Sequence, residues 1–287
     1  MPFRSRSWRS YASTVATKAK RVGLGIDIGG TGVKAALVDL ATGELASSRV
    51  RVATPKPSTP DAVAATVKQV VDTIASEHPL AADMPVGAGL PCVIKGGRVM
   101  TAANIDKSWI GVSAADLFGK ALGRTVVVVN DADAAAVAEA RMGAGRGVGG
   151  TVLLLTIGTG IGSGLLVDGK LVPNTELGHI EFKGRDAERQ LSGVARERRR
   201  LRWRAWAEEF SLYLARLELY LSPDLIILGG GVSKVMDKYR RWLVARAPIV
   251  PAQFLNIAGI IGAALVAADA AATSVPGGAS GRRAARS

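Results

Sequence analysis

The feature that most constrains the fold is a strand–glycine turn–strand pattern that occurs twice in the chain. The segment VGLGIDIGG (22–30) alternates apolar residues into a glycine-rich turn, and VKAALVDL (33–40) follows as a second strand. Residues 149–172, GGTVLLLTIGTGIGSGLLVDGKLV, repeat this order of apolar strand, glycines with threonine, second apolar strand and Asp-Gly. Such an internal repeat predicts two related lobes whose glycine turns face one another.

The composition favours a layered α/β protein. The 287 residues are 48% hydrophobic but only 5% aromatic, and small residues allow helices to pack close to a sheet. The length suffices for two lobes of ordinary size. We expect folded structure to begin near Val22, and helices over 132–142, 205–221, 234–247 and 256–271.

The formal charge of +13 suggests a nucleic-acid-binding protein until the basic residues are located along the chain. Residues 1–21 contain six Lys or Arg and no acid, and residues 272–287 contain three Arg and no acid. With those nine set aside, 28 basic residues stand against 24 acidic ones, and RERRRLRWR (196–204) is the exception in a nearly balanced body. We therefore expect no nucleic-acid partner, and a disordered basic leader that could also pass for a transit peptide.

The numbers of cysteines and histidines and the hydropathy of the chain limit the possible cellular compartment and metal chemistry. Cys92 is the only cysteine, so no disulfide can form within the chain, which is compatible with a reducing, cytoplasmic location. Two histidines make a Cys/His zinc site of three or more ligands barely possible. The segment 252–272 comes nearest to a membrane span, but its Ala, Gly and Asn content predicts a packed helix, and no membrane partner is expected.

The first glycine turn contains the residue types of a phosphate site. Glycines let backbone N–H groups approach an anion because no side chain intervenes. A threonine hydroxyl and a lysine charge add to such binding, and Asp27 at the strand end can hold Mg²⁺ directly or through water. The residues concerned are Asp27, Gly29, Gly30, Thr31 and Lys34. An ordinary hairpin is the alternative, whereas the Walker and dinucleotide motifs are not present in this turn.

Two further glycine-rich segments fit the same chemistry. The second turn has four glycines at alternate positions from 158 to 164, a backbone cost that a purely structural hairpin rarely requires. Its candidate phosphate contacts are Thr156, Gly158, Thr159 and Gly160. The third segment ends a strand and opens a helix whose free N–H groups can receive an anion or nucleotide, although a simple strand-end turn fits equally well. Its residues are Gly229, Gly230 and Gly231.

Polar side chains suited to acid–base and sugar chemistry follow two of the expected strands. Asn130 and Asp131 end the apolar strand TVVVV, at the edge where α/β sheets place ligands. A partly desolvated Asp131 can accept the proton of an attacking hydroxyl, and a helix N-cap at Asp131 or Asp133 is the other interpretation. Glu176 and His179 follow a Pro-Asn turn and are suited to grasp neighbouring sugar hydroxyls, with a structural histidine as the alternative.

Taken in order, these segments resemble the ROK family of sugar kinases, within the actin-like ATPase superfamily. The matching motifs are DIGGTGVK (27–34), Asn130-Asp131, LTIGTGIGSG (155–164), ELGH (176–179) and LGGGVS (228–233). The resemblance covers about residues 22–271 and implies a two-lobed, ribonuclease H-like α/β fold with a cleft between the lobes. It divides the chain into a leader (1–21), a small lobe (22–130 with 259–271), a larger lobe (131–258) and a disordered tail (272–287).

The resemblance also implies roles for individual residues. The aspartate that matches Asp131 is the family's catalytic base, and the turns at 27–34 and 156–162 match its phosphate-binding elements, with 229–231 on the adenosine side. The hexose-binding positions match Asn104, Asn130, Asp131, Glu176 and His179. Such enzymes act on a hexose with a phosphoryl donor and Mg²⁺, and a homodimer is a further implication.

The stretch after ELGH departs from the family pattern. ROK members usually carry a zinc segment, CxCGxxGCxE, at this place, whereas EFKGRDAERQLSGVARERRRLRW (181–203) has no cysteine, so no zinc site is expected. The family's further sugar-binding glutamate cannot be matched securely, and Glu188 and Glu181 are the candidates.

This replacement and the ending PIVPAQFLNIAGIIGAALVA (248–267) resemble the polyphosphate glucokinase branch of the family. The branch implies transfer of phosphate to the 6-hydroxyl of glucose, with mannose as a further sugar, from polyphosphate, ATP or both. Polyphosphate has no base to stack, so clustered cations should supply its affinity, although a solvated helix face is the alternative. The candidate cations are Arg196, Arg198, Arg199 and Arg200, continued by Arg202 and Arg204, with a second group at Lys234, Lys238, Arg240 and Arg241.

Three alternatives stay open. An ATP-only glucokinase, or a ROK kinase for another hexose, differs only in its donor or its sugar. A sugar-responsive regulator of the family would carry an added N-terminal helix-turn-helix domain, for which residues 1–21 are too short. A basic nucleic-acid-binding protein would show salt-sensitive duplex binding without kinase turnover.

Overall fold

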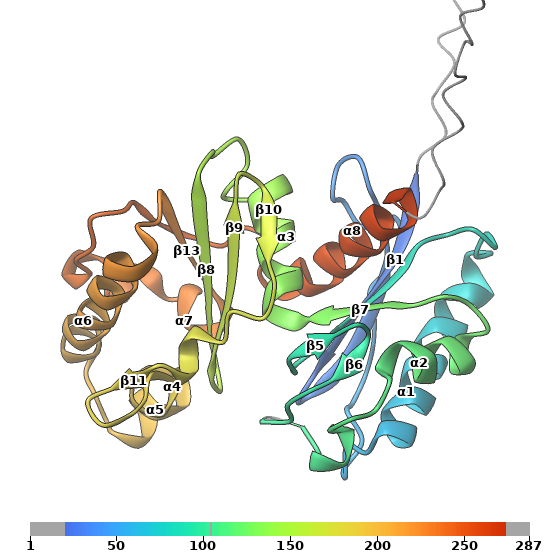
Figure 1. The fold of residues 1–287 in the computed structure, drawn as a ribbon, viewed down its shortest axis with the longest axis horizontal. Helices are drawn as coiled ribbons and strands as arrows, with labels where there is room; N and C mark the ends of the chain where they lie inside the picture. The colour runs from blue at the N-terminus through green and yellow to red at the C-terminus, as the bar shows by residue number, and fades with distance from the viewer. Residues whose placement is uncertain (1–20, 104, 274–287) are drawn as a thin grey trace, which may run out of the picture.

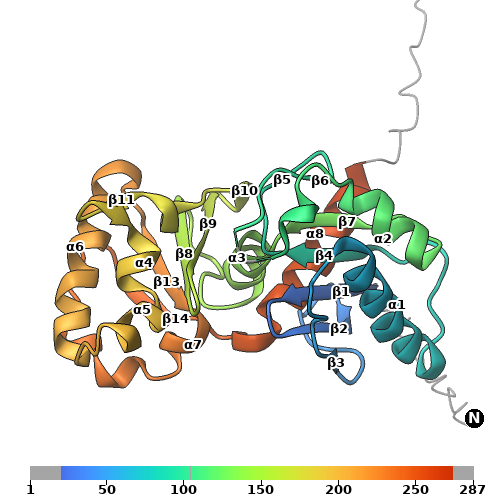
Figure 2. The ribbon, with the colours of Figure 1, turned by 90° about the horizontal axis from the view of Figure 1, so that it is seen from below.

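The computed structural model describes residues 21–103 and 105–273 (Figure 1). Two five-stranded mixed sheets form the centres of two lobes. The helices α3 (Asp131–Met142) and α8 (Ala258–Thr273) pack against each other between the sheets (Figures 1 and 2). The predicted leader, except Arg21, and residues 274–287 of the predicted tail lie outside the described residues, as does Asn104.

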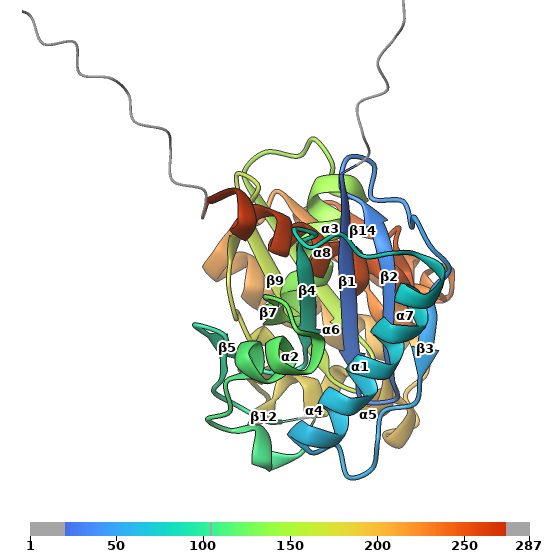
Figure 3. The same cartoon turned by 90° about the vertical axis from the view of Figure 1, so that its right-hand side faces the viewer.

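The first sheet comes from the N-terminal part of the chain. Strand β1 (Val22–Gly29) pairs antiparallel with β2 (Gly32–Asp39), which pairs antiparallel with β3 (Val50–Val52). On the other side of β1, β4 (Val86–Leu90) and β7 (Val127–Asn130) continue the sheet in parallel. Figure 3 shows this sheet between the helices of the small lobe and the pair α3 and α8.

The second sheet repeats this pattern of strand directions. Strand β8 (Thr151–Ile157) pairs antiparallel with β9 (Ile161–Val167), and β9 pairs antiparallel with β10 (Lys170–Val172). Strands β13 (Leu225–Gly229) and β14 (Ile249–Pro251) follow in parallel on the other side of β8. The two orders, β3-β2-β1-β4-β7 and β10-β9-β8-β13-β14, confirm the internal repeat predicted from the sequence.

The uninterrupted apolar runs of the inner strands arise because both faces of the sheets are covered. Successive strand residues point to opposite faces. Leu153 and Leu155 of β8 therefore pack into a core with α6 (Trp203–Leu221), whereas Val152 and Leu154 pack into the core that contains α3 and α8. Strands covered on both faces lose the alternation of apolar and polar residues that marks a surface sheet.

The small lobe and the larger lobe each add helices and short hairpins to their sheet. The small lobe has α1 (Pro60–Glu77), β5 (Ile94–Lys95), β6 (Arg98–Val99), η1 (Lys107–Trp109) and α2 (Ala114–Leu122). The larger lobe has η2 (Leu177–His179), β11 (Glu181–Phe182), β12 (Arg185–Asp186), α4 (Ala187–Leu191), α5 (Gly193–Arg198), α7 (Gly230–Ser233), η3 (Met236–Lys238), η4 (Arg240–Trp242) and η5 (Leu255–Ile257).

Three of the four helices predicted by periodicity are confirmed to within two residues at each end, namely α3, α6 and α8. The fourth, over 234–247, is wrong, because the chain forms the 3₁₀ turns η3 and η4 there. Its apolar residues Met236, Tyr239 and Trp242 recur every three positions, which matches the three residues per turn of a 3₁₀ helix. The Tyr239 ring stacks on Trp203, with centroids 5.1 Å apart, and this packing holds the turns against α6.

Helix α8 lies against the first sheet at a distance that only glycine permits. By length and composition, Leu255–Thr273 is the one helix among the described residues that could cross a membrane, yet Ile260 and Ile261 are fully buried inside the protein. A Cβ on Gly25 of β1 would lie 1.9 Å from the Ile260 carbonyl oxygen, and one on Gly87 of β4 would lie 1.9 Å from the Ala263 carbonyl oxygen. The backbone of α8 therefore rests directly on β1 and β4.

Helices α8 and α3 also meet backbone to backbone. A Cβ on Gly262 would lie 1.6 Å from the carbonyl oxygen of Ala134. We expect Gly262→Ala to lower the free energy of unfolding by about 2–3 kcal/mol, as overpacking of a closed interior does, although alanine is the better helix former by about 1 kcal/mol. Urea denaturation measures the change.

Gly149→Ala is the matched control for this substitution, because a Cβ at Gly149 would meet nothing within 4 Å. If both variants unfold within about 0.5 kcal/mol of each other, the close crossing of α3 and α8 does not limit stability.

Candidate active site

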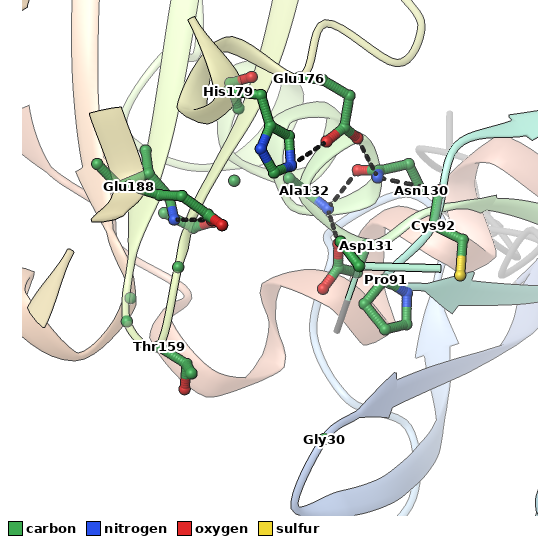
Figure 4. Close-up of a pocket in the computed structure, with 18 of the residues that line it drawn as sticks. Gly30, Pro91, Cys92, Asn130, Asp131, Ala132, Thr159, Glu176, His179 and Glu188 are labelled. Atoms are coloured by element: carbon green, nitrogen blue, oxygen red, sulfur yellow. Dashed lines mark hydrogen bonds and ion pairs between the residues drawn. The ribbon is translucent and has the colours of Figure 1, made fainter. Parts of the chain in front are cut away.

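A single cavity of about 330 Å³ collects predicted site residues from both lobes (Figure 4). The small lobe contributes the first glycine turn and the end of β7, and the larger lobe contributes the second turn, η2, α4 and α7. The predicted residues that line it are Gly30, Asn130, Asp131, Thr156, Gly158, Thr159, Gly160, Glu176, His179, Glu188 and Gly230.

Other predicted residues do not line this cavity. Asn104 lies outside the described residues. The described residues that are absent from the lining are Asp27, Gly29, Thr31, Lys34, Glu181, Gly229, Gly231, Arg196, Arg198, Arg199 and Arg200, together with the further candidate cations Arg202, Arg204, Lys234, Lys238, Arg240 and Arg241.

Sequence reasoning missed part of the wall. The lining residues outside every predicted segment are Pro91, Cys92, Thr101, Ala103 and Ala132, whereas Ile161, Gly162 and Ser163 belong to the predicted second glycine turn without having been named as contacts. Pro91 and Cys92 follow β4, the neighbour of β7 in the sheet, so the strand-end rule that indicated Asp131 also points to them. Burial, with Asp131 and Glu176 adding negative charge, raises the pKa of the Cys92 thiol to about 12.

Asn130 organises the small-lobe side of the cavity. Its side-chain oxygen accepts hydrogen bonds from the backbone N–H groups of Ala132 (2.9 Å) and Asp133 (3.1 Å), so Asn130 is the N-cap of α3. Its amide nitrogen donates to the Cys92 carbonyl (3.1 Å) and to Glu176 Oε1 (3.3 Å). The N-cap interpretation of Asp131 and Asp133 is therefore wrong, because the residue at the strand end already fills that position.

Asp131 is the first residue of α3, where its carboxylate lines the cavity (Figure 4). Burial raises its pKa to about 7, and the nearby charge of Asp27 acts in the same direction. The backbone N–H of Ala132, 2.8 Å from Oδ1, opposes this shift, and Glu176 adds to it. An acid with a pKa near neutrality can both accept and release a proton under ordinary conditions.

Glu176, His179 and Glu188 form the opposite wall. Glu176 Oε2 lies 3.6 Å from His179 Nε2, and His179 Nδ1 lies 3.2 Å from Asp186 Oδ2, so the imidazole is held at both nitrogens. Burial raises the pKa of Glu176. The neighbouring His179 acts to lower this pKa, and the charge of Glu188 acts to raise it further. Glu188 Oε2 accepts a hydrogen bond from the backbone N–H of Ile161 at 3.3 Å, which ties α4 to the start of β9.

The first glycine turn is held from outside the cavity. Arg51 donates from Nη2 to the Thr31 carbonyl at 2.9 Å, and the Thr54 hydroxyl donates to the Gly29 carbonyl. Lys34 Nζ lies 2.7 Å from Asp27 Oδ2, so these two predicted site residues pair with each other. Gly30 is the part of the turn that reaches the cavity.

The second and third glycine segments pack against each other. The Gly158 N–H donates to the Gly160 carbonyl at 3.0 Å, and the Val194 N–H of α5 donates to the Gly158 carbonyl at 3.3 Å. Gly230 has φ +76°, and a Cβ there would lie 2.5 Å from the Ile157 carbonyl oxygen, so both its conformation and its surroundings require glycine. In Figure 4, Gly30 and Thr159 lie on opposite sides of the opening.

The arginines of 196–200 lie beside this site rather than in it. Arg199 makes a two-pronged ion pair with Glu209, with distances of 2.8 and 3.1 Å. The Arg196 guanidinium lies over the Trp203 ring at 4.0 Å and donates to the Leu201 carbonyl at 3.0 Å. Arg198 also donates from Nη2 to the Arg189 carbonyl at 2.6 Å, so three of the four arginines make contacts within the larger lobe, and Arg198 and Arg200 are the two that are exposed.

The described residues contain no group of three or more His, Cys, Asp or Glu placed to hold a metal ion. A metal at this site would therefore need oxygen ligands from another molecule in addition to Asp27 or Asp131.

Comparison with known proteins places the chain in a family. The model of the ROK family matches residues 23–193. The chain belongs to the ROK family, and its fold is the two-lobed, actin-like fold of the family's sugar kinases.

Individual proteins are similar to the chain over most of its length. The polyphosphate glucokinase of Mycobacterium tuberculosis (strain CDC 1551 / Oshkosh) is 45% identical over 255 residues, which cover 88% of this chain and 94% of the relative. The inorganic polyphosphate/ATP-glucomannokinase of Arthrobacter sp. strain KM matches in structure with a TM-score of 0.83 and 51% identity, covering 87% of this chain and 99% of that one. A ROK family glucokinase from Streptomyces griseus, in complex with glucose and AMPPNP, matches with a TM-score of 0.74 and 29% identity, covering 86% and 99%.

The raised pKa of Asp131 predicts a pH-dependent effect on stability. Folding shifts this pKa from 3.8 to about 7, so the folded state binds the proton more tightly than the unfolded state. Ionisation of Asp131 therefore lowers the free energy of unfolding as the pH rises through this range. We expect Asp131→Asn to be more stable than the wild type at pH 8, on the order of 1 kcal/mol because the group is only half-buried, with the difference shrinking towards pH 4.

Urea denaturation at the two pH values tests this prediction. Asp83→Asn, in an exposed loop, controls for the general loss of one negative charge. A difference between Asp131→Asn and wild type that is the same at both pH values would contradict it.

Proposed function

We propose that this protein is a hexokinase-type phosphotransferase that phosphorylates glucose, and also mannose, at the 6-hydroxyl, with inorganic polyphosphate, ATP or both as the donor. The observation that carries this proposal is the single cavity in which Asp131 meets glycines from both turns. The names of the polyphosphate glucokinase and the polyphosphate/ATP-glucomannokinase relatives support the same donors and sugars.

The sugar occupies the part of the cavity between the end of β7 and the segment around η2. Its hydroxyls bind Asn130, Glu176 and His179, with Glu188 as the further glutamate. Glu188 lines the cavity whereas Glu181 does not, which favours Glu188 of the two candidates left open by the sequence. The family resemblance also implies a sugar contact for Asn104.

Asp131 is the general base of the proposed reaction. Its carboxylate accepts the proton of the 6-hydroxyl while that oxygen forms a bond to the terminal phosphorus of the donor and the bridging P–O bond breaks. The shortened donor leaves with the electron pair of that bond. Burial and the charge of Asp27 make Asp131 a stronger base than an exposed carboxylate, because they raise its pKa to about 7.

The glycine turns stabilise the charge of the transferring group. Gly30 and Gly160 line the cavity without side chains that would keep an anion from their backbone N–H groups, and Thr159 adds a hydroxyl. Asp27 lies near Asp131 and would hold Mg²⁺ together with donor oxygens, which suits an ion that takes one or two carboxylates and completes its shell with phosphate and water. When bound, Mg²⁺ neutralises phosphate charge.

The lobes of the proposed enzyme comprise 22–130 with 259–271, and 131–258. The packing of α8 on β1 and β4 supports the return of the chain to the small lobe. Closure of the lobes excludes water from the donor and limits its hydrolysis. We also propose a homodimer in the cytoplasm, without a nucleic-acid or membrane partner, on the strength of the family and the balanced charge of the body.

The proposed activity is tested with purified protein, glucose and Mg²⁺, comparing ATP with long-chain polyphosphate and measuring glucose 6-phosphate. We expect turnover with at least one donor. Asp131→Asn should lower kcat by a factor of about 10²–10⁴, because an amide cannot accept the proton. Its glucose affinity, measured by calorimetry, should stay within about threefold of wild type, because the side chain keeps its shape and its hydrogen bonds. Turnover with ATP alone would support the ATP-only alternative, and near-normal turnover in Asp131→Asn would refute the base.

Polyphosphate binding is proposed to extend from the cavity along the exposed basic surface at Arg198 and Arg200. Helix α5 begins at Gly193, beside the Gly158 carbonyl, and leads from the second glycine turn to Arg198 at its end and to Arg200 beyond it. The double substitution Arg198→Gln with Arg200→Gln should raise the KM for long-chain polyphosphate several-fold and make it less sensitive to salt, because two screened charge interactions are lost. The KM for ATP should change less than about twofold.

Arg146→Gln removes an exposed arginine from the loop after α3 and is the matched control. An equal rise in the KM for both donors, or no rise for polyphosphate, would rule out a polyphosphate role for Arg198 and Arg200.

A further inference from the structure

Asn174 connects the two lobes beside the proposed sugar site. It lies in the segment between β10 and η2, two residues before Glu176. Its side-chain oxygen accepts a hydrogen bond from the Ile94 backbone N–H at 2.9 Å, and its amide nitrogen donates to the Ile94 carbonyl at 3.0 Å. Ile94 opens the β5–β6 hairpin of the small lobe, two residues after Cys92 in the cavity wall. One side chain thus satisfies both backbone groups of a residue in the other lobe.

Asp133 fixes the backbone of Asn174 on the side of the larger lobe. The Asn174 N–H donates to Asp133 Oδ2 at 2.7 Å. Asp133 is fully buried, and its Oδ1 is a buried oxygen without a hydrogen-bond partner. Burial raises its pKa to about 7, against the effect of the Asn174 N–H. A buried, incompletely paired carboxylate costs stability, which indicates that holding Asn174 in place has a purpose other than stability.

The residues that follow Asn174 in this segment are also fixed by hydrogen bonds. The Leu177 N–H donates to Ser163 Oγ at 2.9 Å, and the Tyr213 hydroxyl donates to the Leu177 carbonyl at 3.1 Å. Between these contacts and Asn174 lies Glu176, with φ +20°, and Asn174 itself has φ +61°. Backbone conformations of this kind persist in non-glycine residues only where the surrounding contacts determine them. The position of the Glu176 carboxylate therefore depends on the contacts on both sides of it.

Besides the packing of α3 on α8, hydrogen bonds between side chains and the opposite lobe lie at this end of the cavity. Asn174 bonds to Ile94 twice, and Asn130 bonds to Glu176. Among the described residues, no hydrogen bond joins the glycine turn at 27–34 to the one at 156–164. The sugar end is thus fastened across the lobes while the donor end is free to open.

We propose that Asn174 is a positioning residue for hexose binding, which clamps the small lobe to the larger one and thereby sets the distance from Glu176 to Asn130. This inference rests on the proposed function, because the ligand at this end of the cavity is the hexose. The clamp holds the sugar half of the site in its binding geometry before the donor arrives. It contributes to glucose affinity and leaves donor affinity unchanged.

Asn174→Gly tests the clamp in the full-length protein. Glycine adopts φ +61° without strain, so the substitution removes both cross-lobe hydrogen bonds and leaves the backbone conformation available. We expect calorimetry without donor to show glucose affinity about tenfold weaker, equivalent to about 1.4 kcal/mol. The KM for glucose should rise by a similar factor, while the donor KM and kcat change less than about threefold. Hydrogen exchange at the Ile94 amide should become faster, because its acceptor is gone.

Two further variants control this experiment. Lys183→Gly makes the same kind of replacement at another non-glycine residue with positive φ (+52°), in the β11–β12 turn away from the cavity, and should bind glucose as the wild type does. Asn174→Asp keeps the oxygen that accepts from Ile94 N–H and loses the amide that donates to the Ile94 carbonyl. It should weaken glucose binding and raise the KM for glucose with little change in kcat, as expected for Asn174→Gly. It serves in place of Asn174→Gly if that variant does not fold.

The inference is overturned if Asn174→Gly binds glucose with wild-type affinity. It is also overturned if glucose affinity, donor KM and kcat all worsen together with a lower Tm, because that pattern marks a residue needed only for the fold. The proposed function is tested separately on the wild-type protein. If the wild type neither binds nor phosphorylates glucose, the proposed function is refuted. Exchange at Ile94 then still reports whether the cross-lobe clamp exists.

Discussion

The rest of the structure depends on the direct packing of α8 on β1, β4 and α3. At Gly25, Gly87 and Gly262 the backbones approach so closely that no side chain fits between them. Contacts of this kind have little freedom to slide, because a rigid backbone rather than a flexible side chain meets the neighbour. Helix α3 begins at Asp131, so the same contacts that join the two sheets also fix the proposed base relative to both of them.

The cavity gathers negative charge that the fold alone does not need. Asp131 and Glu176 line it, Asp27 lies near Asp131, and burial together with the charges of Asp27 and Glu176 raises the pKa of Asp131 to about 7. Proteins tolerate such destabilising groups mainly where chemistry requires them. The N-cap role of Asn130 makes the arrangement possible, because it satisfies the start of α3 and leaves the Asp131 carboxylate facing the cavity.

Sequence patterns predicted what depends on local order along the chain. The repeated strand–glycine turn–strand unit indicated two matching sheets, and the strand-end rule located Asp131. The patterns failed where contacts between distant segments decide. The spacing of Met236 and Tyr239 fits a 3₁₀ turn that only the packing on α6 reveals. Lys34 is a local exception, because it pairs with Asp27, its partner across the β1–β2 hairpin, instead of reaching the cavity. The bond from Asn174 to Ile94 spans 80 residues and depends on how the lobes meet, which no periodicity encodes.

The buried thiol in the cavity wall makes site-specific labelling of this protein straightforward. Thiol-directed reagents attack an accessible thiolate, whereas Cys92 is only 3% exposed and burial raises its pKa. It is also the only cysteine in the chain. A cysteine introduced on the surface of each lobe would therefore take up a spectroscopic probe selectively, without first removing the native residue, and the opening and closing of the lobes could be followed in otherwise unaltered protein.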